Sequence, residues 1–257
     1  MQAFVGYIKK EGRMMRTFLI IMLGLLAGLI IFSLYTSSKA NGIDIHAAKL
    51  IAAFILCGIH IGYLPIYMIK SLGNESNRMH LWLTQPQPAW QLLGGKLLTG
   101  LGGFALSFLI SLGYLLIAIQ PLKGIIMNTS VENVYTLIGS VALFIALASL
   151  YLAIGYQFAW SIYKTLYSRL KSWSVVVTLI VLIALMMLLE KISQLPGLHE
   201  LNSLTVDFPT LHTSTQQISI QAESIGQFPI GWLLFGIIKA ILLFATSCYL
   251  LERKVEV

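Results

Sequence analysis

The stretch TFLIIMLGLLAGLIIFSLY, residues 17–35, decides the class of fold, because it runs for 19 residues without a charged side chain. Its centre, residues 20–32, is apolar on every face of a helix, so no polar stripe is left to face water. Five more apolar stretches follow, at 50–69, 97–119, 135–160, 173–189 and 229–251. A bilayer core about 30 Å thick needs about 20 apolar residues per helix. The sequence therefore predicts an all-α, polytopic membrane protein whose six transmembrane helices form a single domain.

The overall composition agrees with a membrane protein. Charged residues make up 11% of the chain, against about 25% in soluble domains. The formal net charge is +7, but the basic residues lie between the apolar stretches and form no cluster with interleaved aromatic side chains. The lipid bilayer is thus an expected partner, and nucleic acid is not.

The lysines and arginines are distributed unevenly over the two sides of the membrane. With the N-terminus in the cytoplasm, twelve of them fall inside: Lys9, Lys10, Arg13, Arg16, Lys70, Arg78, Lys96, Lys164, Arg169, Lys171, Arg253 and Lys254. Four fall outside: Lys39, Lys49, Lys123 and Lys191. This bias follows the positive-inside rule. Both termini of this multi-pass protein are therefore predicted to be cytoplasmic.

Residues 1–16 precede the first span and carry an amphipathic pattern. One side of a helix over this range would present Phe4, Val5, Ile8 and Met15. The other side would present mainly Lys9, Lys10, Arg13 and Arg16. The pattern predicts an interfacial helix on the inner leaflet, and the alternative is a frayed basic leader.

Motifs of enzymes are missing from the sequence. The string nearest to a phosphate-binding loop, around Gly94-Gly95-Lys96, lacks the first glycine and the hydroxyl after the lysine. There is no metalloprotease or nucleophile-elbow motif and no cluster of cysteine and histidine. We therefore expect no catalytic residue and no metal site, and we do not expect this chain to hydrolyse ATP by itself.

Two polar residues inside the spans are candidates for a substrate pathway. Lys239 lies near the middle of the last span, where a charge costs about 2.5–3.5 kcal/mol on insertion scales. The alternative is a snorkelling side chain. His60 lies within the second span. The alternative to a role in the substrate pathway is that His60 is a hydrogen-bonded interior residue. Small-residue motifs for close helix packing occur at Gly24/Gly28, Gly58/Gly62 and Gly103/Ser107/Ser111.

The most specific signal is the segment ESNRMHLWLTQPQPAWQLLGGKLL, residues 75–98. It begins as a short amphipathic helix, which Pro86 and Pro88 end, because proline lacks the amide donor and restricts the residue before it. A second helical run then leads into the third span, with Lys96 at the inner interface. The cytoplasmic loop 71–96 is therefore predicted to form a rigid elbow, and the alternative is an ordinary loop.

This segment resembles the first cytoplasmic loop of ABC-2 type transporter permeases. The residues that match in order are Glu75, Leu81, Leu83, Thr84-Gln85-Pro86, Trp90 and Gly95-Lys96. The layout of the whole chain is also similar, with a basic leader, six spans and a longest external loop at 191–228. The resemblance implies the membrane-spanning subunit of a bacterial ATP-binding cassette exporter.

The same resemblance implies partners and a contact site. A second permease chain, identical or different, would complete the pathway. ATP and Mg would be bound by a separate ABC ATPase subunit, so this chain would hold no cofactor. The contact with that ATPase would be a coupling helix that carries Glu75, Arg78, Leu81, Trp82 and Leu83.

The apolar spans favour a hydrophobic or amphipathic substrate, such as an antimicrobial peptide, a lipid-like molecule or a drug. Export of antimicrobial peptides, or protection against them, is the favoured role. One alternative is an ion-coupled secondary transporter, which should carry acidic residues in its spans. The others are a membrane enzyme and a non-transporting anchor or sensor subunit.

Overall fold

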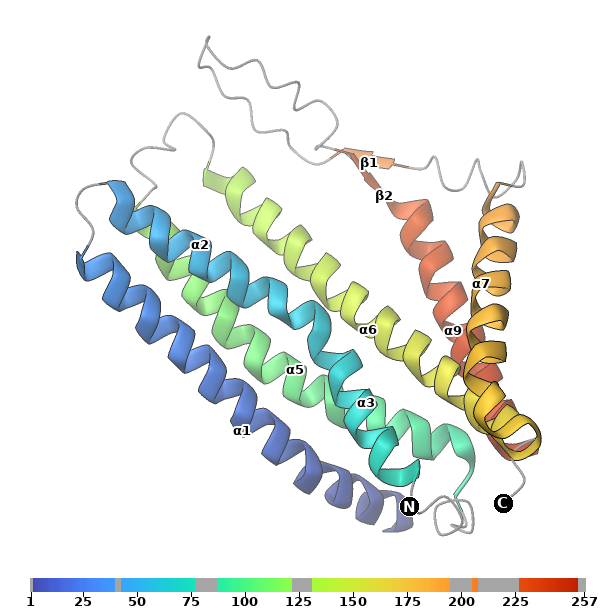
Figure 1. The fold of residues 1–257 in the computed structure, drawn as a ribbon. Coiled ribbons are helices and arrows are strands. Elements are labelled where there is room, and N and C mark those ends of the chain that lie inside the picture. Colours follow the sequence, from blue (N-terminus) through green and yellow to red (C-terminus); the bar gives the residue numbers. More distant parts are fainter. Residues whose placement is uncertain are drawn as a thin grey trace. The chain divides into compact units, whose positions relative to one another are not determined.

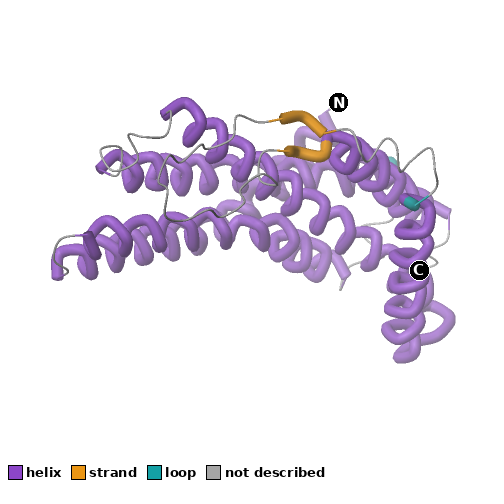
Figure 2. The backbone as a smooth tube through the Cα atoms, turned by 90° about the horizontal axis from the view of Figure 1, so that it is seen from above, coloured by secondary structure: helices purple, strands orange, loops and turns teal. Residues whose placement is uncertain are grey.

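The structure, a computed structural model, describes residues 2–39, 43–76, 87–121, 131–194, 205–207 and 227–253. Its helices are α1 (Gln2–Lys39), α2 (Ile43–Ile59), α3 (Tyr63–Ser76), α5 (Ala89–Ile119), α6 (Val131–Leu170), α7 (Ser174–Ser193) and α9 (Ile230–Arg253) (Figure 1). Helices make up nearly all of the described chain (Figure 2). The predicted all-α class is confirmed for these residues.

Five helical stretches among the described residues are long and apolar enough to cross a membrane. They are Phe4–Lys39, His46–Ser76, Ala89–Ile119, Tyr135–Ser193 and Leu233–Arg253. The fourth is 59 residues long and contains both of the spans predicted at 135–160 and 173–189. The second contains a short 3₁₀ helix, His60–Gly62, between α2 and α3. A multi-pass membrane protein is thus supported by length and composition.

The predicted interfacial helix at 1–16 and the predicted first span at 17–35 lie in one continuous helix, and their division at the membrane surface stays a prediction. Residues 2–39 form one helix of 38 residues, about 57 Å long at 1.5 Å per residue. No proline interrupts this range, and lysine, arginine, glutamate and methionine around its junction are good helix formers. The helix therefore continues through the expected boundary.

The short helix predicted to begin at Glu75 lies mostly outside the described residues, so it stays a prediction. Glu75 lies in the last turn of α3, which continues the second span to Ser76. Gly73 does not end that helix, because a single glycine costs only about 1 kcal/mol in a helix interior and the next proline is Pro86. The helical run predicted to lead into the span at 97–119 is the start of α5, which begins at Ala89.

A sharp turn of the chain separates α6 from α7 (Figure 1). A 3₁₀ helix, Lys171–Trp173, forms this turn, and Lys171 has φ of 45°. A non-glycine residue in this left-handed region is destabilised by roughly 1–2 kcal/mol. The turn divides the longest apolar stretch into two helices.

Two short strands lie in the segment predicted as the external loop. β1 (Thr205–Asp207) pairs antiparallel with β2 (Gln227–Pro229), and Val206 is opposite Phe228. Three-residue strands are too short for an alternating pattern to reveal them in a sequence. β2 leads directly into α9, so the pairing fixes the start of the last helix.

The described residues form two compact units. The first unit comprises residues within Met1–Ser71 and Gly94–Leu150. The second comprises residues within Leu72–Leu93, Tyr151–Thr210 and Ser219–Val257. α3, α5 and α6 each begin in one unit and end in the other, because the divisions fall inside these helices.

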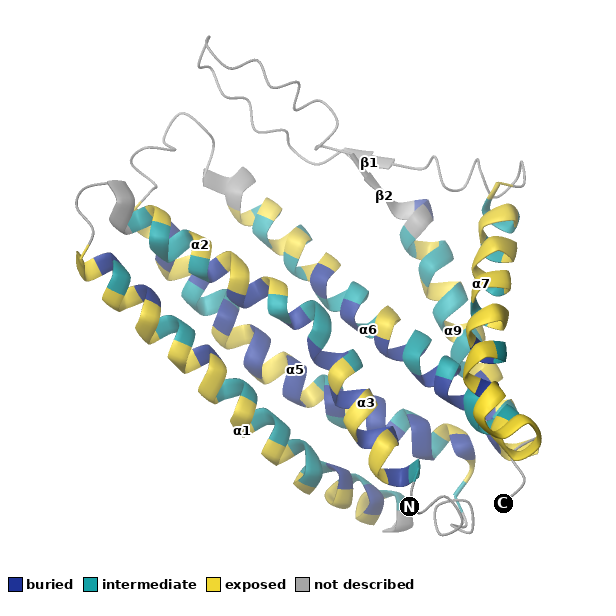
Figure 3. Ribbon diagram, viewed as in Figure 1, coloured by how far each residue is buried: buried dark blue, intermediate teal, exposed yellow. Residues whose placement is uncertain are grey.

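In the first unit, α1 packs along α2 (Figure 1), and the buried core lies mainly on α2, α3 and α5 (Figure 3). The predicted small-residue motif on α5 is confirmed, since Gly103, Ser107 and Ser111 are buried. The glycines at 24, 28 and 58 differ, because a Cβ added to any of them would meet no atom within 4 Å. These glycines face open space in the described structure, so they do not hold the first unit together.

In the second unit, α7 is exposed along most of its length (Figure 3). Its buried residues are Ser174 and Thr178 in the first two turns. α9 is likewise largely exposed, although Ser247, Cys248 and Leu251 near its end are buried. In a bilayer, these apolar faces would contact lipid or other protein chains.

Candidate functional site

A buried ion pair connects α1 with α5 in the first unit. The Nζ atom of Lys96 lies 2.8 Å from Oε1 of Glu11, and both side chains are 0% exposed. Opposite charges in a low-dielectric interior attract strongly, but taking each out of water is unfavourable, so such a pair needs further hydrogen bonds. The surrounding side chains supply them.

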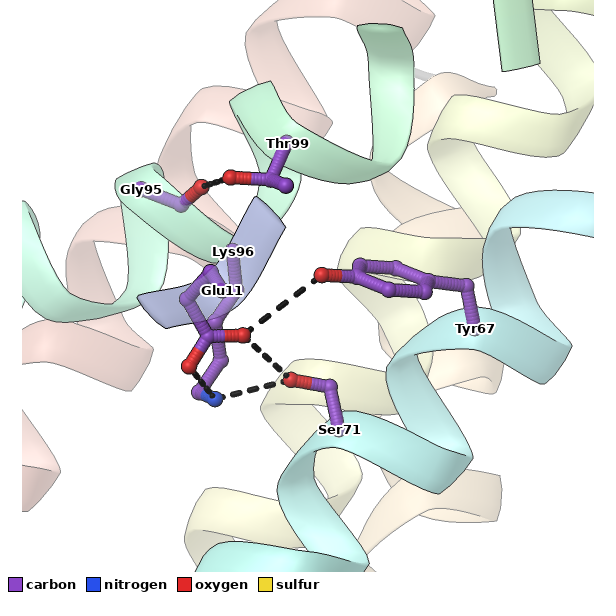
Figure 4. A network of polar contacts seen from close by, with 6 residues as sticks. All are labelled: Glu11, Tyr67, Ser71, Gly95, Lys96 and Thr99. Carbon is purple, nitrogen blue, oxygen red and sulfur yellow. Dashed lines mark hydrogen bonds and ion pairs between the residues drawn. The ribbon is translucent and has the colours of Figure 1, made fainter. Parts of the chain in front are cut away.

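Two hydroxyl groups from α3 complete the coordination of the ion pair (Figure 4). Lys96 also donates to Oγ of Ser71 at 2.7 Å, and Ser71 donates to Oε2 of Glu11 at 3.1 Å. The Tyr67 hydroxyl donates to the same oxygen at 3.5 Å. Both carboxylate oxygens therefore accept hydrogen bonds, and three helices meet at one polar cluster. We call Glu11, Tyr67, Ser71 and Lys96 the ion-pair cluster.

The sequence brings these helices together by placing glycines of α5 under tyrosine rings. A Cβ on Gly95 would lie 2.8 Å from the ring of Tyr7, and one on Gly100 would lie 2.7 Å from the ring of Tyr67. Only glycine permits this close approach, which holds the backbone of α5 near α1 and α3. Tyr67 and Ser71 are one turn apart and so face the same way.

The sequence analysis did not predict the ion pair of Glu11. The predicted apolar side of the leader included Val5, which is 56% exposed. The buried side instead carries Tyr7 and Glu11, four residues apart. A signal was present, since Glu11 is the one acidic residue among four basic residues of the leader. Lys96, predicted as an interface marker, is its partner.

His60 lies farther along the interior of the first unit, in the 3₁₀ helix between α2 and α3. It is fully buried, its Nδ1 lies 2.8 Å from the Leu56 carbonyl oxygen and its Nε2 lies 3.1 Å from Ser107 Oγ. A carbonyl oxygen accepts only, so Nδ1 donates to Leu56, and both ring nitrogens have a hydrogen-bond partner. The rings of Phe104 and Phe108 lie against the imidazole. The geometry matches the alternative of a hydrogen-bonded interior residue.

The predicted ATPase contact falls mostly outside the described residues. Arg78, Leu81, Trp82 and Leu83 lie between 76 and 87, where the structure describes nothing. Glu75 is described, and its side chain is buried at the end of α3 in the second unit. The structure thus fixes one end of the predicted coupling segment.

The other end of that segment is fixed by a carboxylate. The backbone N–H of Ala89, the first residue of α5, donates to Oε1 of Glu252 at 2.8 Å within the second unit. The amides of Gln91 and Leu92 donate to the Pro88 carbonyl oxygen. A carboxylate at a helix N-terminus satisfies an unpaired amide and interacts favourably with the helix dipole. The end of α9 therefore caps the start of α5.

Lys239 lies in α9 and has no carboxylate within ion-pair distance among the described residues. Its Nζ lies 4.4 Å from the centroid of the Phe235 ring, one turn earlier. The side chain is half-buried. Lys239 and His60 belong to different units.

The described residues contain no group of three or more histidine, cysteine, aspartate or glutamate side chains that could hold a metal ion. Comparisons with known proteins add no function: no protein-family profile, curated protein or solved structure matches this sequence.

Proposed function

We propose that this chain is the membrane-spanning subunit of a bacterial ATP-binding cassette exporter. It would cross the plasma membrane six times with both termini in the cytoplasm. A separate ABC ATPase subunit would bind ATP and Mg, and a second permease chain, identical or different, would complete the pathway. The substrate would be hydrophobic or amphipathic.

The observation that carries the proposal is the anchoring of α5. Glu252 caps this helix at Ala89, and Lys96, seven residues later, joins it to α1 and α3. α5 is one unbroken helix from Ala89 to Ile119. A partner that moved the segment before Ala89 would therefore act directly on the first turn of this helix. A coupling segment needs such an arrangement, whereas a passive loop does not.

The length of the fourth apolar stretch supports six crossings. Its 59 residues would span about 88 Å as one helix, nearly three times the thickness of a bilayer core of about 30 Å. The turn at Lys171–Trp173 divides it into two helical parts, residues 135–170 of α6 and Ser174–Ser193, which is α7. Two crossings from this stretch, with one from each of the other four, give six.

Co-purification tests the proposal. The protein is expressed with a candidate ABC ATPase from the same genome, and the ATPase retained on the tagged permease is measured. Leu81→Asp and Trp82→Asp should abolish retention if the segment is the docking site. Trp173→Asp is the matched control, because Trp173 is 71% exposed at another predicted cytoplasmic turn. Lack of retention by the unmodified protein, or equal retention by all variants, would refute the coupling assignment.

A second candidate, an ion-coupled transporter, is favoured by one observation. Glu11 is a buried carboxylate within the candidate span Phe4–Lys39, and buried carboxylates serve proton relays in such proteins. Its ion pair with Lys96 favours a fixed structural charge instead. The energy source separates the two: transport by the reconstituted protein alone, driven by an imposed proton gradient, would support the second candidate.

A further inference from the structure

Lys239 lies deep in the last helix. It follows Ile230, the first residue of α9, by nine residues and precedes Arg253, the last, by fourteen. These separations correspond to about two and a half and about four helical turns. A lysine at this depth places its ammonium group well inside the apolar part of a span, where an uncompensated charge is unfavourable.

The surface around Lys239 is open and apolar. Gly236, one turn earlier on the same face, leaves room, because a Cβ added there would meet no atom within 4 Å. The ring of Phe235 lies against the ammonium group. Ile238 and Leu242, the flanking residues, are more than half exposed. The cation therefore has an aromatic ring on one side and free space beside it.

No carboxylate among the described residues lies within ion-pair distance of Lys239. The carboxylates of the described helices are Glu11, Asp44, Glu75, Glu132, Glu190 and Glu252. All except Glu11 lie within four residues of a helix end, and Glu11 is bonded to Lys96. The ammonium group of Lys239 is therefore open to an anion from another molecule.

We infer that Lys239 binds the negatively charged group of an amphipathic substrate, whose apolar chain lies along α9 beside Gly236 and Leu242. The inference rests on the proposed export function and narrows its substrate class. A phosphate or carboxylate paired with an ammonium group forms a strong, charge-assisted hydrogen bond. An acidic, lipid-like molecule fits this face, whereas a cationic peptide would be repelled by Lys239.

The test compares three amphiphiles with the same chain but different charge. Hexadecyl phosphate, hexadecylphosphocholine and hexadecyltrimethylammonium are titrated onto the purified full-length protein in phosphatidylcholine nanodiscs, and the bound ligand is measured by native mass spectrometry. Lys239→Met should weaken the binding of hexadecyl phosphate by at least about tenfold, in line with the loss of a charge-assisted hydrogen bond. Lys239→Arg should restore it.

The matched control is Lys164→Met. The Nζ atom of Lys164 also lies near aromatic rings, 5.7 Å from the centroids of Tyr163 and Tyr167, and the variant should bind hexadecyl phosphate like the unmodified protein. Equal affinity of Lys239→Met and the unmodified protein for hexadecyl phosphate would overturn the inference. So would an equal loss for the cationic amphiphile, or displacement of hexadecyl phosphate by phosphatidylglycerol in the disc, which would make a membrane lipid the ligand.

The outcome is independent of ATPase docking. Selective binding of hexadecyl phosphate without retention of an ATPase would support the anion site at Lys239 and refute the exporter function. Retention of the ATPase without selective binding of hexadecyl phosphate would support the exporter function and refute only the anionic substrate class.

Discussion

Two lysines in long apolar helices have opposite surroundings. Lys96 on α5 is fully buried, and its ammonium group donates to a carboxylate and to a hydroxyl. Lys239 on α9 is half-buried and has one described contact of its ammonium group, an aromatic ring. The first lysine has its charge neutralised within its own chain. The second leaves its charge available to another molecule.

The difference separates a structural charge from a binding charge. A neutralised lysine between three helices holds them in register, and its removal leaves a buried carboxylate without its partner. A lysine on an open face contributes little to folding, so its presence in a span needs another reason. The predictions below test whether the two residues differ in this way.

The largest effect is expected from Lys96→Met. It leaves the Glu11 carboxylate buried without its cation, which should lower the free energy of unfolding by about 3–5 kcal/mol. Unfolding by sodium dodecyl sulfate in dodecyl maltoside micelles, followed by circular dichroism, measures the change. Since a hydrophobic pair of similar volume can replace a buried ion pair, Glu11→Leu combined with Lys96→Met should recover most of the loss. A single variant as stable as the unmodified protein would show that the ion-pair cluster has no structural role.

A smaller effect is expected from glycine substitutions one turn from each lysine. A Cβ on Gly100 would lie 2.7 Å from the Tyr67 ring, so Gly100→Ala should destabilise the fold by about 1–3 kcal/mol, as overpacking does. Gly236→Ala meets open space and gains helix propensity, so stability should stay the same or rise by up to about 1 kcal/mol. The same unfolding assay compares the two variants. Equal changes would mean that the surroundings of the two lysines are equally packed.

The contrast between these lysines also shows what a sequence can predict. Helices and candidate spans follow from local apolar runs of about 20 residues, and the start of α9 at Ile230 lies one residue from its expected position. The ion-pair cluster joins residues that are 85 and 60 positions apart, Glu11 with Lys96 and Glu11 with Ser71. No periodicity within one helix reveals such a pairing. The short strands Thr205–Asp207 and Gln227–Pro229 are missed for the same reason, because each exists only through its partner.

Lys239, by contrast, stands out in sequence and structure alike, because a single charge interrupts an apolar span. The smallest effect on stability is therefore expected from Lys239→Met. This variant loses one contact with the Phe235 ring, which is worth about 0.5–1 kcal/mol at an exposed site. It also removes a charge from an apolar surface. The free energy of unfolding should change by less than about 1 kcal/mol, measured as for Lys96→Met. A loss as large as that of Lys96→Met would mean that Lys239 also holds the fold together. A small change in the free energy of unfolding, together with the loss of hexadecyl phosphate binding, would show that the two lysines have different roles. Lys239 would serve binding, and Lys96 would serve folding.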